Sequence, residues 1–136
     1  MLKNFKIKTK YNEVYDITEH VKKAVEESGV KEGTCLVYNP HSTAGLAVFS
    51  PWDPDGFLDL DEEIRRLVPT RIDFKHQHDT PQDAAGHVKS ALLGISGNFI
   101  VHEGKLLVGG SQGIYILLRE FVGCFFRMFL LVFNDH

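Results

Sequence analysis

The chain has 136 residues, of which 43% are hydrophobic and 24% are charged, a composition that favours a single globular domain spanning residues 1–136. Its formal net charge of −3 argues against a nucleic-acid-binding protein, because phosphate binding needs a basic surface. The N-terminus is charged and alternating, unlike a signal or transit peptide, so we expect a cytoplasmic protein.

The N-terminal part of the chain is predicted to form two strands and a helix. Residues 3–9 alternate apolar and polar side chains, as a half-buried strand does, and residues 13–15 are expected to continue a hairpin with it. Asp16, followed by Glu19 three residues later, matches a capping box. The sequence therefore predicts a helix that begins at this cap and ends at Gly29.

Two short apolar stretches, 34–38 and 44–49, predict buried strands. The sequence Asn-Pro-His-Ser-Thr separates them, so His41 is expected at a strand end, from which a side chain can reach a site on a rigid frame. A turn signal at residues 51–56 precedes a second predicted helix, which Pro69 closes.

Residues 76–94, HQHDTPQDAAGHVKSALLG, contain the signals of a third helix. Thr80 is a candidate N-cap, Pro81 suits the first helical position, and Gly94 is placed to end the helix. Helical spacing predicts an apolar side made of Ala84, Val88 and Leu92.

The rest of the chain is predicted to be mainly strand. Residues 98–101 and 105–108 form two strands separated by a turn at Glu103-Gly104. The apolar segment after residue 113 has the length of a membrane span, but it contains Arg119, Glu120 and Arg127, which are costly in a bilayer. It is therefore predicted to form two strands, 114–118 and 128–133, covered on both faces by two layers or by a subunit contact. The order of elements favours an α+β fold with antiparallel sheets and about three helices.

The last two strands are expected to be joined by a two-residue turn at Gly123-Cys124, which sets Glu120 opposite Arg127. An ion pair between these two residues is the favoured interpretation, and the alternative is that Arg127 binds a phosphate-bearing ligand. Cys124 and Cys35 both lie in apolar runs, so we expect buried thiols in a reducing compartment.

Three histidines from different predicted elements are candidate metal ligands. His41 lies at a strand end, His76 in a loop and His87 on the third helix, where Asp83, one turn earlier, can orient its ring. Zinc or a similar ion needs converging neutral imidazoles, usually three ligands with one open position in a catalytic site. His78 is a spare ligand or a replacement for His76. The alternative interpretation is a polar loop with solvated histidines.

Other candidate motifs carry weaker signals. The glycine-rich segment 109–113 can offer backbone N–H groups to an anion, but its spacing matches no phosphate-binding motif and favours a bend between strands. The sequence contains no convincing nucleophile, because Ser42, Thr43 and Ser111 lie near histidines but no G-x-S-x-G elbow is present.

Several motifs, taken with Glu120 and Arg127, resemble the YjbQ-like family. Members of this family are small proteins described as having secondary thiamine-phosphate synthase activity. The resemblance to archaeal members is the strongest. The motifs are H-S-T-A-G-L at 41–46, D-P at 53–54 with Asp59, the block 76–94, and G-K-L-L-x-G with Q-G-I-Y within 104–115. The resemblance implies a sandwich-like fold that assembles as a homotrimer. It also implies a metal site at the subunit interface, lined by the matching histidines.

The chain departs from the family pattern in three places. Phe49-Ser50 replaces the usual Asn-Glu, Gly110-Ser111 replaces the usual Thr-Trp, and Cys124-Phe125-Phe126 replaces a basic, proline-containing run. Any role of these positions in binding a charged substrate is open in this chain.

The function implied by the resemblance is the joining of a pyrimidine diphosphate to a thiazole phosphate. A divalent ion, zinc or magnesium, would be held by His41, His76 and His87 and would carry the charge of the departing diphosphate. The other expected catalytic residues are Gln112 and Glu120, with His41 and His87 also counted as catalytic. The expected substrate-binding residues are Ser42, Thr43, Lys89 and Arg127. The alternatives are a metal-dependent hydrolase of a small substrate and a non-enzymatic, trimeric metal- or ligand-binding protein.

Overall fold

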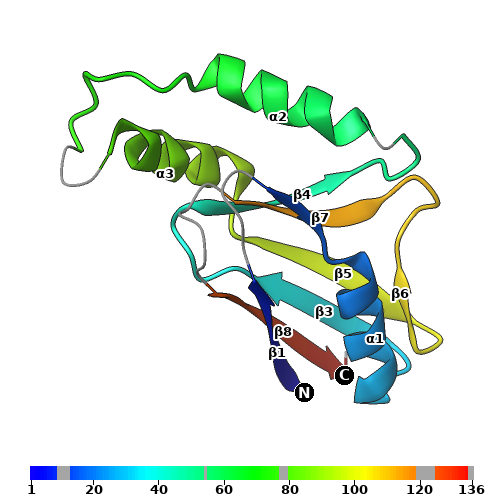
Figure 1. Cartoon of the computed structure of the whole chain (residues 1–136). Coiled ribbons are helices and arrows are strands. Elements are labelled where there is room, and N and C mark those ends of the chain that lie inside the picture. The colour runs from blue at the N-terminus through cyan, green and yellow to red at the C-terminus, as the bar shows by residue number, and fades with distance from the viewer. Residues whose placement is uncertain (9–12, 54, 77–79, 119–124, 135–136) are drawn as a thin grey trace.

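Two antiparallel sheets form the frame of the protein (Figure 1). The computed structural model describes residues 1–8, 13–53, 55–76, 80–118 and 125–134. The five-stranded sheet consists, in spatial order, of β1 (Leu2–Lys8), β8 (Phe125–Asn134), β3 (Gly33–Tyr38), β5 (Ser96–His102) and β6 (Lys105–Leu107). The three-stranded sheet consists of β2 (Val14–Asp16), β7 (Gly113–Leu118) and β4 (Ala44–Phe49).

The described helices lie on different sides of this frame. In Figure 1, α2 (Gly56–Leu67) and α3 (Pro81–Leu93) lie together beyond the three-stranded sheet, and α1 (Thr18–Ser28) lies beside the five-stranded sheet. The predicted α+β class, with antiparallel sheets and three helices, is confirmed. No helix in the described ranges is long and apolar enough to cross a bilayer.

The core lies between the two sheets and α1. Strand β7 is the centre of its sheet, and its residues Ile114, Ile116 and Leu117 are fully or almost fully buried. Alternate residues of β8, including Met128 and Leu130, contribute to the same core.

Cys35 is fully buried, and this burial raises the pKa of its thiol to about 11, as expected for a thiol that packs as a small apolar group. Cys124 lies outside the described residues.

The two predicted hairpins, one between residues 3–9 and 13–15 and one between 114–118 and 128–133, are both wrong. Strand β1 pairs with β8 rather than β2, and β7 pairs with β2 and β4 rather than β8. Alternation of apolar residues defines the faces of a strand but not its neighbours, and β7, buried on both faces, must lie between two layers. The residue opposite Arg127 is consequently Lys6, while Glu120 lies outside the described residues.

Local turn and cap predictions are more accurate. The turn between β5 and β6 forms at Glu103-Gly104, with φ angles of 51° and 77°, the positive values that a two-residue type I′ turn needs. In α1, Asp16 does not form the expected capping box. Its carboxylate instead accepts hydrogen bonds from the backbone and the side chain of Thr18, and Ile17 occupies the cap position.

Helix α3 packs closely on β4, and this contact positions the candidate site. A Cβ at Gly45 would lie 2.6 Å from the Cβ of Leu93, so only glycine permits this approach. The predicted apolar side of the helix is wrong, because Val88 and Leu92 are exposed and only Ala84 is buried. The helix instead buries a face rich in small residues, Ala84, Ala85, Gly86 and Ser90, together with Lys89.

Candidate metal centre

The start of α3 holds two of the candidate ligands in fixed positions. Thr80 is the N-cap, and its hydroxyl oxygen accepts a hydrogen bond from the backbone N–H of Asp83 at 3.2 Å, with Pro81 in the first turn. These features confirm the predicted helix start. Because Asp83 and His87 are one helical turn apart, their side chains project from the same face.

Three side chains converge beside this helix. The Oδ2 atom of Asp83 lies 3.1 Å from Nε2 of His87 and 3.4 Å from Nε2 of His76. The ligand atoms of the three residues all lie within 4.8 Å of one another. The two imidazole rings meet edge to face, with centroids 5.1 Å apart. We call this group the histidine cluster.

The hydrogen bond of His87 to Ser42 identifies the tautomer of its ring. Its Nδ1 atom lies 3.1 Å from the backbone carbonyl oxygen of Ser42, which only accepts, so Nδ1 carries the proton. In the neutral ring, Nε2 then presents a lone pair to the Asp83 carboxylate, which is also an acceptor. Two acceptors in contact need a cation between them, either a proton on Nε2 or a metal ion.

The donor set fits a metal ion. Two imidazole nitrogens and one carboxylate oxygen are a ligand set used by zinc. With metal–ligand bonds of about 2.0–2.2 Å, ligand atoms around a tetrahedral ion lie about 3.4 Å apart, close to the two measured separations from Asp83. Magnesium prefers oxygen ligands and is less well matched.

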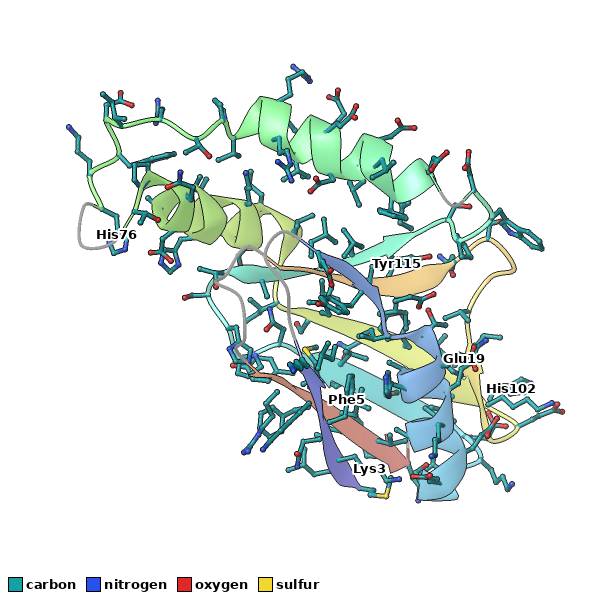
Figure 2. The ribbon with its side chains drawn as sticks, viewed as in Figure 1. Lys3, Phe5, Glu19, His76, His102 and Tyr115 are labelled. Atoms are coloured by element: carbon teal, nitrogen blue, oxygen red, sulfur yellow. The ribbon has the colours of Figure 1, made fainter. Side chains whose placement is uncertain are left out.

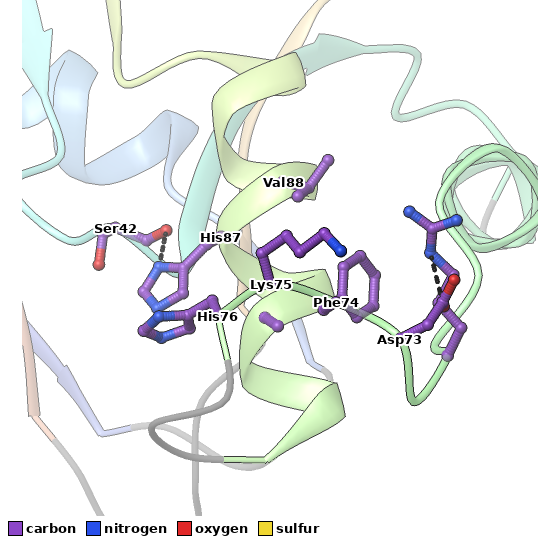
Figure 3. A pocket seen from close by; sticks show the side chains of 9 residues that line it. Ser42, Asp73, Phe74, Lys75, His76, His87 and Val88 are labelled. Atoms are coloured by element: carbon purple, nitrogen blue, oxygen red, sulfur yellow. Dashed lines mark hydrogen bonds and ion pairs between the residues drawn. The ribbon is translucent and has the colours of Figure 1, made fainter.

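The histidine cluster borders the pocket shown in Figure 3, which has a volume of about 720 Å³. Its wall includes Ser42, Arg71, Phe74, Lys75, His76 and His87. We call it the histidine pocket. The volume falls in the range of about 300–1,000 Å³ that small-molecule sites occupy.

His41 is not part of the histidine cluster. Its Nε2 atom accepts a hydrogen bond of 3.1 Å from the backbone N–H of Arg127. The Asn39 side chain holds the loop around it, through bonds to the backbone of His41 and to the carbonyl oxygen of Ala44. His41 therefore connects the loop before β4 to the start of β8.

The remaining predicted site residues lie in different environments. Ser42 lines the histidine pocket, whereas Thr43 and Lys89 are buried, with exposed fractions of 1% and 6%. Arg127 is exposed on β8. Glu120 and His78 lie outside the described residues, so their predicted roles stay predictions.

Gln112 lines a second pocket, of about 390 Å³, which we call the glycine-turn pocket. Its other lining residues include Asp16, Thr18, Lys22, Gly109 and Gly110. It lies where β7 begins, at the end of the three-stranded sheet away from His76 (Figures 1 and 2). Departures from the family pattern occur here too, since Gly110 lines this pocket and Phe49 pairs with Gly113.

Sequence reasoning missed the ligand role of Asp83 in the histidine cluster and two residues of the histidine pocket, Arg71 and Lys75. Asp83 was interpreted only as a residue that orients His87, although the same one-turn spacing suits two ligands on one helix face. Arg71 and Lys75 lie in the connection between α2 and α3 and match no motif, so only the folded structure brings them to the pocket.

Comparisons with known proteins agree with this architecture. Residues 3–123 match the family model described as "UPF0047 protein YjbQ-like". The UPF0047 protein MJ1081 of Methanocaldococcus jannaschii is 37% identical over 90% of this chain and 86% of its own length. The UPF0047 protein YugU of Bacillus subtilis is 36% identical over 94% and 98%. Archaeal and bacterial relatives match about equally, which does not support the expected closer resemblance to archaeal members.

Solved structures show the same fold. A YbjQ-like protein of unknown function from Sulfolobus solfataricus superposes with a TM-score of 0.92 at 26% identity, covering 99% of this chain and 97% of that one. An uncharacterised protein of the YjbQ/UPF0047 family from Clostridium acetobutylicum superposes with a TM-score of 0.87 at 34% identity, covering 96% and 98%.

Proposed function

The chain belongs to the YjbQ-like UPF0047 family, and we propose that it is a metal-dependent enzyme acting on a small phosphorylated substrate in the histidine pocket. His76, Asp83 and His87 hold the ion. The observation that carries the proposal is the contact between the Asp83 carboxylate and two imidazole nitrogens, at 3.1 and 3.4 Å, beside an open pocket.

Each residue of the cluster has a defined task in this proposal. Asp83 is only 13% exposed, and its Oδ2 atom faces both imidazoles. The carbonyl oxygen of Ser42 keeps the proton of His87 on Nδ1, which leaves Nε2 available as a ligand. A bound divalent ion would supply positive charge to a phosphate or diphosphate group in the pocket.

The reaction we propose is the one that the sequence resemblance implies. A pyrimidine diphosphate and a thiazole phosphate would be joined to give thiamine phosphate, with pyrophosphate as the leaving group. The bond that breaks joins the pyrimidine methylene to the diphosphate oxygen, and the bond that forms joins this methylene to the thiazole nitrogen. Cationic groups near the leaving group favour this step, because negative charge accumulates there.

Assembly as a homotrimer is part of the proposal, and it is supported by the outer face of the five-stranded sheet. Leu131 and Phe133 of β8 are 38% and 43% exposed, while Val132 between them is fully buried. Their apolar neighbours on this face are Leu2, Leu36, Tyr38 and Phe129, which line a shallow pocket with Leu131. By contrast, β7 is buried within one chain and gives no support for a subunit contact.

A cytoplasmic location is also proposed, supported by the buried thiol of Cys35.

Metal and substrate tests address the two parts of the proposal separately. Purified protein is stripped with a chelator, reloaded with zinc or magnesium, and assayed with both substrates for thiamine phosphate. We expect about one zinc ion per chain and product only in the loaded sample. His102→Gln, which removes an exposed histidine far from the pocket in Figure 2, is the matched control.

Three outcomes would contradict the proposal. Failure of the stripped protein to bind zinc in equilibrium dialysis would remove the metal centre. Zinc binding with no turnover of either substrate would leave a metal-binding protein, and release of phosphate without coupling would indicate a hydrolase.

A further inference from the structure

The connection between α2 and α3 brings two cationic side chains to the wall of the histidine pocket. Arg71 and Lys75 line this pocket together with His76 and His87. Figure 3 shows Lys75, in that view, between the two imidazole rings and the ring of Phe74. Neither Arg71 nor Lys75 belongs to the histidine cluster, so their presence in the pocket needs a separate explanation.

Arg71 is held by two neighbours in its own segment. Its Nε atom lies 3.4 Å from Oδ1 of Asp73, and its guanidinium carbon lies 4.8 Å from the centroid of the Phe74 ring. These contacts involve Nε and the face of the guanidinium group. No ion pair or hydrogen bond joins Arg71 to any other residue that the structure describes. The guanidinium group, with its five N–H donors, therefore has donors left for a ligand.

Lys75 has no acidic partner among the described residues. Its ammonium group forms no ion pair within 4.0 Å in the described ranges, although Asp73 and Asp83 are both nearby in sequence. Asp73 is paired with Arg71, and Asp83 faces the two histidines. The described residues thus balance the positive charge on this wall only in part.

We propose that Arg71 and Lys75 form a phosphate subsite that binds the phosphate or diphosphate group of the substrate beside the metal ion. This inference rests on the proposed function and adds the residues that recognise the charged group. A forked guanidinium and a point-charged ammonium together suit the several oxygens of a phosphate group. The other lining residues are the polar Ser42 and Asp73, the latter paired with Arg71, and the apolar Phe74, Ala84 and Val88. The substrate class is therefore a phosphorylated small molecule with an apolar or aromatic body.

Pyrophosphate binding to the zinc-loaded protein tests the subsite directly. Isothermal titration calorimetry compares the wild type with Lys75→Met, Arg71→Met and Arg71→Lys. We expect each Met variant to weaken pyrophosphate binding about tenfold, the effect of losing one charge-assisted hydrogen bond. Arg71→Lys should be intermediate, because it keeps the charge but loses the fork. The matched control is Lys105→Met, an exposed lysine of β6, which should bind as the wild type does. Figure 1 shows β6 at the opposite side of the molecule from the connection between α2 and α3.

Zinc affinity, measured alone, separates this inference from the proposed function. We expect the Met variants to bind zinc as tightly as the wild type. Equal pyrophosphate affinity in Lys75→Met, Arg71→Met and Lys105→Met would overturn the subsite and leave the metal centre intact. Weakened zinc binding in Lys75→Met or Arg71→Met would also overturn it, because these residues would then act through the ion. A wild type that binds no zinc would overturn the proposed function, and the same titrations without zinc would still test the cationic pair.

Discussion

The histidine pocket and the glycine-turn pocket both contain polar residues from distant parts of the chain, but their polar atoms are arranged differently. In the glycine-turn pocket, donors meet acceptors. Gln112 Oε1 accepts the backbone N–H of Gly109 at 2.8 Å, and Lys22 pairs with Glu19 at 2.8 Å. In the histidine cluster beside the other pocket, two imidazole nitrogens and a carboxylate oxygen meet, and these are all ligand atoms. Satisfied pairs stabilise a fold, whereas converging acceptors need a proton or a metal ion between them.

The largest expected effect comes from removing one acceptor of the histidine cluster. His87→Ala should weaken zinc binding more than about a hundredfold, because even residues that support ligands cost about 10–100-fold when they are lost. The side chain is 36% exposed, so the Tm of the metal-free protein should change by no more than about 4 °C, roughly the effect of 1 kcal/mol. Equilibrium dialysis and thermal melts give both values.

Arg127→Ala provides the comparison for this variant. Its side chain is exposed opposite Lys6, so its removal should leave both zinc affinity and Tm nearly unchanged. Loss of zinc binding in Arg127→Ala with retention in His87→Ala would move the candidate site from the histidine cluster to β8.

A smaller effect is expected when the support of the histidine pocket is altered. Gly45→Ala places a Cβ 2.6 Å from Leu93, so α3 must shift away from β4. Overpacking of this kind costs about 1–3 kcal/mol, and the shift should also weaken zinc binding because α3 carries Asp83 and His87. Urea unfolding measures the first effect and zinc titration the second. Gly110→Ala is the control, since no atom lies within 4 Å of its added Cβ.

The glycine-turn pocket should respond in stability alone. Gln112→Ala removes the hydrogen bond to the Gly109 N–H and should cost at most about 1 kcal/mol, because this bond is exposed. Zinc and pyrophosphate binding should both be unchanged. A large loss of pyrophosphate affinity in Gln112→Ala would instead give this pocket a functional role and reverse the comparison.

The smallest expected effect concerns the exposed pair His102 and Glu32, 2.9 Å apart, which resembles His87 and Asp83 without a third ligand. Hydrogen bonds from Glu103 N–H and His102 lower the pKa of Glu32, and the bond to Glu32 raises the pKa of His102. The pair therefore stabilises the fold fully between the unfolded values of 4.5 and 6.5. This contribution is lost as pH falls through the lowered pKa of Glu32 or rises through the raised pKa of His102.

His102→Gln tests this pH dependence. The Tm of this variant should lie further below the wild-type Tm at pH 6 than at pH 8.5. In a protein that keeps His102 and Glu32 but lacks the histidine cluster, this pair should bind no zinc. A Tm deficit of equal size at both pH values would show that proton binding by this pair does not affect stability.

The sequence predicted those features that depend on neighbouring residues. Thr80, Pro81 and Gly94 delimit α3 as expected, because capping and termination depend on local backbone chemistry. The turn at Glu103-Gly104 was predictable for the same reason. Strand partners were not, since β1 and β7 each pair with strands far away in the sequence, and an alternating pattern carries no information on the partner.

The same distinction applies to the candidate site. His76 and His87 were selected because histidine is a common ligand, and the structure brings them together. His41 was selected with them, but its ring accepts the N–H of Arg127, a partner 86 positions away that no local pattern indicates. Asp83 was assigned a supporting role, because sequence spacing does not distinguish a carboxylate that orients a ring from one that shares its ion.

The hydrogen bond from His87 to the Ser42 carbonyl has a consequence for the folding equilibrium. Ser42 lies in the segment that crosses from β3 in one sheet to β4 in the other, so this bond ties a ligand on α3 to the point where the two sheets are joined. A ligand that binds only the native arrangement stabilises that arrangement as a whole. Zinc would then act as a reporter on sheet docking, and its affinity would fall in core variants whose mutated residue lies nowhere near the ion.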